Sequence, residues 1–216
     1  MFSPCGRKTE KVYCKSCEFL VDSQIESLPV NPFDIIRANR WGLVTYQELA
    51  DLLGTSQEEI IQASASCDGF TIFNGRNYCI AYNSRVRQYS RIAFTLLHEA
   101  AHIVLGHFAE CDSFHNNLAF YRQFESEANF FASNVMAPYV VMRECGLLTP
   151  QLLHCACGLS YEAAERRLAG YRCWSPRAID KKVFSNFSAF IRFSRIQSVH
   201  RPDIEIIRDE TVSAAK

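Results

Sequence analysis

The spacing of apolar residues along this chain predicts a mostly helical protein. Hydrophobic positions recur every three or four residues through residues 90–107 and again through 118–136, which is the period of an amphipathic α-helix. Shorter segments with the same pattern follow at about 149–156, 160–170 and 176–193. The sequence therefore predicts two long helices with several short helices behind them.

The first third of the chain also has a helical pattern, in several short pieces. Residues 1–10 lack any pattern and are expected to form a loose tail, whereas residues 11–66 are expected to be helical. One helix is predicted over residues 19–28. Another is predicted to start at Thr45, because Thr45 followed three residues later by Glu48 is a capping-box signature.

The periodicity changes in residues 68–83, which read DGFTIFNGRNYCIAYN. Two runs rich in β-branched and aromatic residues flank the pair Asn74-Gly75, and this pair is a strong signal for the turn of a β-hairpin. We therefore predict an α+β fold that is mostly helical, with a small antiparallel sheet packed on the helix that covers residues 90–107.

Composition and charge narrow the class of protein. The chain has 216 residues, 48% of them hydrophobic, which argues against disorder and is enough to form a large core. The formal net charge is zero, so bulk electrostatics favour neither nucleic acid nor membrane as a partner. Residues 160–201 carry nine Lys and Arg against three Asp and Glu. This local excess fits a solvated helical face or a partner surface.

The ten cysteines are expected to be reduced in a cytoplasmic protein. The first residues lack the apolar run of a signal peptide, and no stretch is long enough to span a bilayer. Cys14 and Cys17 form a CxxC pair, but a structural zinc there would need two more ligands. Cys5, Cys155 and Cys157 are conceivable partners, although no second CxxC or CxxH pair exists.

The most informative motif is His98-Glu99-Ala100-Ala101-His102, which lies inside the first long helix. Residues four apart on a helix share a face, so both imidazoles can point at one ion. Zn²⁺ accepts neutral imidazole nitrogens, and Glu99 is placed to act on a water molecule. The alternative interpretation is a pair of histidines on a helix surface.

A hydrolytic zinc site needs a third protein ligand and an open position for water. The second long helix offers Glu125 and Glu127, which point about 200° apart around the helix axis. We favour Glu125, since it shares a face with Asn129, whose amide can hydrogen-bond a ligand imidazole. His107 follows His102 by five residues and points about 140° away, so it is expected to be a structural histidine at the helix end.

Such a site would hydrolyse peptide bonds, with Glu99 accepting a proton from water and passing it to the leaving amine. The edge strand of the hairpin is the natural place for an extended peptide to bind. Tyr121, one helical turn before Glu125, is either a hydrogen-bond donor to the developing oxyanion or an aromatic residue of the core or rim.

The segment TLLHEAAHIVLGH, followed by ESEANFFASNVMAP, resembles the ImmA/IrrE family of zinc metallopeptidases. The similarity covers roughly residues 68–170, and its last part resembles a degenerate helix-turn-helix unit. The resemblance implies zinc ligation by His98, His102 and Glu125, with Glu99 as general base. It also implies a cytoplasmic endopeptidase, often linked to mobile elements, that cleaves a helix-turn-helix repressor and so relieves repression.

On this basis we predict three segments along the chain. Residues 1–66 form an N-terminal helical region, residues 67–146 form a zincin-like metallopeptidase core, and residues 147–216 form a helical, helix-turn-helix-like region. The expected partner is a protein substrate, and no membrane is expected. The substrate assignment rests on analogy alone.

Two other functions remain open from the sequence. One is a non-catalytic regulator that binds a repressor or DNA through its C-terminal helices. DNA is an unlikely partner, because residues 161–170 contain Glu162 and Glu165 beside Arg166 and Arg167, and carboxylates repel phosphates. The other is a peptidase with an unrelated substrate.

Overall fold

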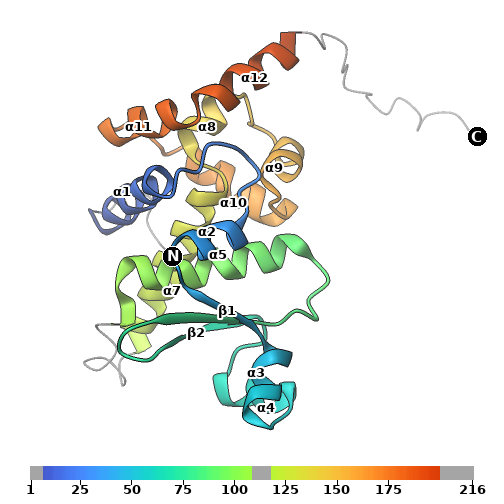
Figure 1. Cartoon of the computed structure of the whole chain (residues 1–216). Coiled ribbons are helices and arrows are strands. Elements are labelled where there is room, and N and C mark those ends of the chain that lie inside the picture. Colours follow the sequence, from blue (N-terminus) through green and yellow to red (C-terminus); the bar gives the residue numbers. More distant parts are fainter. Residues whose placement is uncertain (1–6, 109–117, 200–216) are drawn as a thin grey trace, which may run out of the picture.

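The computed structural model describes residues 7–108 and 118–199, and it confirms the mostly helical α+β class. A long central helix, α5, lies between a small sheet on one side and most of the other helices on the opposite side (Figure 1). The elements are α1 (Arg7–Asp22), α2 (Pro32–Ala38), β1 (Gly42–Thr45), α3 (Tyr46–Leu53), α4 (Gln57–Ser64), β2 (Gly69–Phe73), β3 (Tyr78–Tyr82), α5 (Tyr89–Leu105), α7 (Leu118–Met136), α8 (Tyr139–Glu144), α9 (Pro150–Cys157), α10 (Tyr161–Tyr171), α11 (Ala178–Asn186) and α12 (Ser188–Val199).

The predicted hairpin is present as strands β2 and β3, which pair in the antiparallel direction. The side-chain oxygen of Asn74 accepts hydrogen bonds from the backbone N–H groups of Arg76 and Asn77. Gly75 has a φ of 87°, a conformation that glycine adopts at little cost. The strand order is β1-β3-β2, so β2 forms an edge of the sheet.

The sheet has a third strand that the sequence did not predict. Residues 42–45 fall in the region expected to be helical, but they form β1, which pairs in parallel with β3 and makes the sheet mixed. Four residues are too few to show a strand period, and their partner lies far along the chain. A Cβ on Gly42 would come within 2.9 Å of the Cys79 Sγ, so glycine permits this close pairing.

The two faces of the sheet pack against different helices. Consecutive residues of a strand point to opposite faces. Ile80 therefore packs in a cluster with Ile36 and Leu96 from α2 and α5, while Ala81 packs with Tyr46 and other residues of α3 and α4. The sheet is thereby fixed on α5, and β2 is held along the side of that helix.

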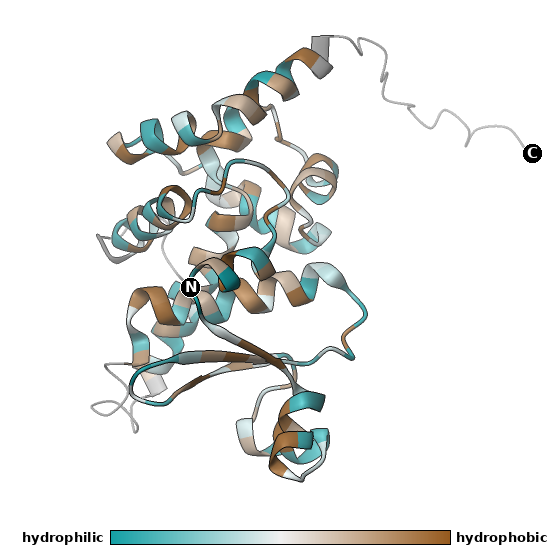
Figure 2. Ribbon diagram, viewed as in Figure 1, coloured by the Kyte–Doolittle hydropathy of each residue, from teal (hydrophilic) through white to brown (hydrophobic). Residues whose placement is uncertain are grey.

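The largest core cluster joins α5 and α7 to α1 and to the helices near the C-terminus. Ala101, Ala128 and Ala132 have no exposed surface, and these small side chains let α5 and α7 approach closely. Figure 2 shows hydrophobic stretches along the strands and along α5.

The predicted division into three segments stays a prediction. No helix within residues 7–108 and 118–199 is long and apolar enough to span a bilayer.

The capping box predicted at Thr45 is present at the start of α3. Thr45 accepts a hydrogen bond from the backbone N–H of Glu48, whose carboxylate accepts one from the backbone N–H of Thr45. Ser56 and Glu59 make the same reciprocal pair at the start of α4. Such caps satisfy N–H groups that the first turn of a helix leaves without a partner.

The boundaries of α1 differ from the prediction. The helix already begins at Arg7, inside the expected tail, and it ends at Asp22, well before residue 28. Gln24 has a φ of 53°, which turns the chain and buries Ile25. Burial against the core thus overrides the local helical pattern.

The predicted helix over residues 176–193 is two helices. α11 ends at Asn186 and α12 begins at Ser188, with Phe187 fully buried between them. The amide of Asn186 donates a hydrogen bond to the carbonyl oxygen of Ile25. The break therefore coincides with contacts to a distant segment, which a local pattern does not report.

Candidate metal centre

Helix α5 brings the two histidines of the HEAAH motif to one point. His98 and His102 are one turn apart, and their Nε2 atoms lie 3.1 Å from each other. Ala100 and Ala101, between them in sequence, are fully buried and fix which side of the helix faces the core. Both imidazoles therefore project from the same face of α5.

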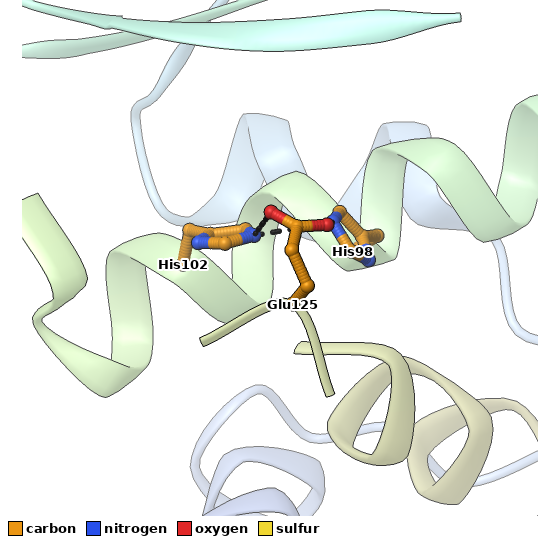
Figure 3. A group of neighbouring side chains, drawn as sticks. All are labelled: His98, His102 and Glu125. Carbon is orange, nitrogen blue, oxygen red and sulfur yellow. Dashed lines mark hydrogen bonds and ion pairs between the residues drawn. The ribbon is translucent and has the colours of Figure 1, made fainter. Parts of the chain in front are cut away.

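Glu125 joins the two histidines from α7. Its Oε2 lies 3.4 Å from Nε2 of His98, and its Oε1 lies 3.5 Å from Nε2 of His102. Figure 3 shows the carboxylate placed across both imidazoles. Within the described parts of the chain, these three residues form the group that could hold a metal ion, with one ligand atom from each within 4.8 Å of the others.

The spacing of these atoms fits a tetrahedral zinc ion. Bonds of about 2.0–2.1 Å in a tetrahedral site place neighbouring ligand atoms about 3.3 Å apart. The separations of 3.1, 3.4 and 3.5 Å are close to that value. Two imidazoles and one carboxylate are also a ligand set that Zn²⁺ uses when a fourth position is left for water or substrate. The residues present therefore fit this metal.

Neighbouring groups prepare the imidazoles for ligation. The Nδ1 of His98 lies 3.1 Å from the amide oxygen of Asn129, the contact that the sequence suggested. Because that oxygen only accepts, the proton of neutral His98 lies on Nδ1, which leaves its Nε2 to bind a metal. Burial lowers the pKa of His102, so this imidazole is neutral at pH 7.

The acidic groups around His98 stabilise a positive charge at this site. Burial alone would lower the pKa of His98, but the hydrogen bond to Glu125 and the charge of Glu99 outweigh it and raise the pKa. The hydrogen bond from His98 in turn lowers the pKa of Glu125. A positive charge placed among these side chains is therefore stabilised.

Glu99 lies in the same cleft, outside the group of three. Its side chain is nearly buried, and the hydroxyl of Thr71 donates a 2.8 Å hydrogen bond to its Oε2. Burial raises the pKa of Glu99. Thr71 belongs to the edge strand β2, so this contact joins strand and helix at the site. No sequence pattern indicated Thr71, because its contact with Glu99 depends on how β2 lies on α5.

A close approach between β2 and α5 makes this contact possible. A Cβ on Gly69 would come within 2.6 Å of the Thr95 Cγ2 and 3.1 Å of the Ala81 carbonyl oxygen. Glycine at this position therefore lets the strand lie directly on the helix, with Thr71 over Glu99.

The group of three lines an open cleft of about 620 Å³ between β2, α5 and α7. Tyr121 also lines the cleft and is 63% exposed, so it is a rim residue and not a core aromatic. Phe94 lines both this cleft and a neighbouring pocket of about 200 Å³ at the start of α10. The three residues that could hold the metal are thus accessible to a large ligand.

The structure separates Glu127 from the group that Glu125 joins. Glu127 contacts His107, and its Oε2 lies 3.3 Å from Nε2 of that imidazole. The prediction that His107 points away from His102 was wrong, since the two Nδ1 atoms are 3.0 Å apart. Helix α5 ends at Leu105, and Gly106 turns the chain with a φ of 78°. His107 therefore returns to His102 instead of continuing the helical rotation.

In the part of the chain that the structure describes, the CxxC pair forms no recognisable metal site. Cys17 is fully buried, and burial raises the pKa of its thiol to about 12, which disfavours the thiolate that zinc binds. Neither Cys14 nor Cys17 belongs to a candidate metal group within residues 7–108 and 118–199. Cys5, one conceivable partner, lies outside the described residues.

Comparison with known proteins adds one family match. Residues 48–169 match the family model described as Peptidase_M78, IrrE N-terminal-like domain. The match covers more than half of the 216 residues and includes the whole group of His98, His102 and Glu125 together with Glu99. No curated protein matches the chain.

Proposed function

Because the chain belongs to the Peptidase_M78 family, with an IrrE N-terminal-like domain, we propose that it is a zinc-dependent endopeptidase. The observation that carries the proposal is the convergence of two imidazoles and a carboxylate, from α5 and α7, in one open cleft beside Glu99. A peptidase family and a ligand set suited to hydrolytic zinc point to the same chemistry.

His98, His102 and Glu125 would hold the ion, and the residues around them would complete the reaction. When bound, Zn²⁺ supplies Lewis acidity that polarises the scissile carbonyl and makes water more acidic. Glu99 accepts a proton from the attacking water and delivers it to the leaving amine. Its raised pKa suits both steps, since a carboxylate nearer neutrality accepts and returns a proton more readily.

The walls of the cleft provide the means to bind a peptide. Strand β2 lies at the edge of the sheet and lines the cleft, so an extended substrate can add to it by backbone hydrogen bonds. Thr71 holds Glu99 from that strand, which places the general base beside the bound backbone. Tyr121, exposed at the opposite rim on α7, is positioned to donate to a developing oxyanion.

The proposed substrate is a helix-turn-helix transcriptional repressor in the cytoplasm, whose cleavage relieves repression. The resemblance of both motif segments to ImmA/IrrE peptidases supports this finer proposal. A protein substrate is also consistent with the open shape of the cleft, which can admit a chain segment and not only a small molecule.

The alternative of a non-catalytic DNA-binding regulator has less support. In α10, Arg167 is 2% exposed and donates to the carbonyl oxygen of Ala137, so it is not available for phosphate contacts. Arg166 is exposed but pairs with Glu162, with 3.2 Å between the charged atoms. A strongly salt-dependent affinity for duplex DNA would favour this alternative over the peptidase.

The test compares the wild-type protein with Glu99→Gln. Each is co-expressed with a candidate helix-turn-helix repressor, and purified protein is analysed for zinc. We expect repressor cleavage only with wild type, because the amide cannot accept the proton from water. Zinc content should be the same, since Glu99 lies outside the ligand group. Equal processing by both proteins would remove Glu99 from the mechanism, and a wild type without stoichiometric zinc would contradict the metal assignment.

A further inference from the structure

We propose that Glu127, acting through His107, is a positioning residue that fixes the tautomer of His102 and so prepares its Nε2 to bind the metal. The inference rests on the proposed metal site, and it gives His107 and Glu127 a common role. Their geometry sets both residues apart from zinc ligation. Their side chains nevertheless form a series of hydrogen bonds that leads from Glu127 through His107 to His102.

The contacts form one continuous series behind the ligand group. Nδ1 of His102 lies 3.0 Å from Nδ1 of His107, and Nε2 of His107 lies 3.3 Å from Oε2 of Glu127. Gln123 donates a 2.6 Å hydrogen bond to the other carboxylate oxygen, Oε1. The series therefore runs from His102 on α5, through His107 just after the end of that helix, to Glu127 on α7.

The carboxylate determines the direction of these hydrogen bonds. An ionised Glu127 only accepts, so Nε2 of His107 must carry a proton and donate it. In neutral His107 the other nitrogen, Nδ1, is then an acceptor. His102 consequently donates from its own Nδ1, which leaves the Nε2 of His102 with a free lone pair. That nitrogen is the one beside Glu125 and His98.

The opposite direction would disable the ligand. If His107 donated from Nδ1 to His102, its Nε2 would face the carboxylate of Glu127 as a second acceptor, with two lone pairs opposed. Neutral His102 would then carry its proton on Nε2, where the metal should bind. Glu127 thus selects the binding tautomer of His102 from a distance of two hydrogen bonds.

Burial and stacking keep this series in place. The side chain of His107 is 6% exposed and that of Glu127 is 13% exposed, so water competes little for their contact. The ring of Phe124 stacks on His107 with 4.3 Å between centroids and an angle of 16°. An imidazole held this way cannot rotate to another partner without losing the stacking contact.

The other histidine of the motif has an equivalent arrangement. Asn129 accepts a hydrogen bond from Nδ1 of His98. A side chain of α7 therefore determines the tautomer of each imidazole, Asn129 for His98 and Glu127 for His102. Partners of this kind orient metal ligands and raise their basicity. The difference is that His98 is held directly, whereas His102 is held through a second imidazole and a buried carboxylate.

The test measures zinc affinity, which does not require turnover. The dissociation constant of Zn²⁺ is determined by competition with a chromophoric chelator for full-length wild type, Glu127→Gln and His107→Leu. We expect each variant to bind zinc about 10–100-fold more weakly, the usual loss when a residue behind a metal ligand is replaced. The double variant should lose no more than either single variant, since both act on the same imidazole.

A matched control is Glu162→Gln, the same change at an exposed position on α10, which should leave zinc affinity within about twofold. The absorption of bound Co²⁺ gives a second measurement, and its visible bands should shift in Glu127→Gln but not in Glu162→Gln. Melting curves recorded with a chelator show whether each variant is folded.

Zinc affinity and cobalt spectrum unchanged in folded Glu127→Gln would overturn the inference. So would additive losses in the double variant. Complete loss of metal in Glu127→Gln, with Glu125→Gln still binding tightly, would show Glu127 to be a direct ligand instead. A wild type that binds no zinc would contradict the proposed function itself, so the two failures are distinguishable.

Discussion

The surroundings of Glu99 determine the pKa and the position of its carboxyl group. Burial raises its pKa, while the hydroxyl of Thr71 and the charge of His98 favour the ionised form and limit the rise. The hydrogen bond from Thr71 also holds the carboxylate beside strand β2. A general base needs both a suitable pKa and a defined position, and β2 contributes to both.

Replacing Thr71 by valine tests this contact at the scale of one residue. Valine keeps the shape and the β-propensity but cannot donate to Glu99. We expect kcat for cleavage of the proposed repressor substrate to fall about tenfold, the effect of losing one charge-assisted hydrogen bond. Zinc affinity should not change, since the hydroxyl of Thr71 bonds Glu99, which lies outside the group of three ligands. A variant with wild-type kcat would show that Glu99 needs no support from β2.

At the scale of elements, the position of α7 decides the site, and α10 holds the end of α7. Arg167 from α10 donates to the carbonyl oxygen of Ala137, just after α7, and also to the side-chain oxygen of Asn134. Its guanidinium group lies 3.4 Å from the centre of the Tyr139 ring. This buried cation thus joins the C-terminal end of α7 to the region that resembles a helix-turn-helix unit.

The neighbouring arginines of α10 allow a matched test of that contact. Arg167→Leu leaves two buried acceptors without a donor, so we expect a loss of about 2–4 kcal/mol in the free energy of unfolding. Arg166→Leu removes only an exposed ion pair and should cost less than about 0.5 kcal/mol. Urea denaturation of both variants measures the difference. Equal stability of the two would mean that Arg167 does not hold α7.

At the scale of the whole molecule, the metal would join the two sides of the cleft. His98 and His102 come from α5 and Glu125 from α7, and these helices share the largest core cluster. A ligand that binds only the folded state stabilises it by mass action. Occupancy of the site should therefore be visible in the unfolding of the entire protein.

We expect zinc at 100 times its dissociation constant to add about 2.7 kcal/mol of stability over protein kept in a chelator. For a chain of this size, that corresponds to a rise in Tm of about 5–10 °C. Glu99→Gln should show the same rise, whereas His102→Gln should show almost none, because it lacks one ligand. Differential scanning fluorimetry measures all three. An equal rise in His102→Gln would place the zinc elsewhere.

The elements with a strong local signal could be predicted from the sequence. The capping pair Thr45 and Glu48, the Asn74-Gly75 turn and the long helix at residues 118–136 all lie where the pattern placed them. Strand β1 could not be predicted, because four residues acquire a strand conformation only by pairing with β3. The end of α1 and the break at Phe187 likewise depend on burial against distant segments.

For the candidate site, the sequence by itself determined which residue types are present and which of them share a helix face. The spacing of His98 and His102, and of Glu125 and Asn129, follows from the geometry of one helix. Only the tertiary structure decided that the two faces meet, that Thr71 reaches Glu99, and that His107 turns back to His102. These contacts join separate elements or follow a left-handed glycine, so no helical period along the chain encodes them.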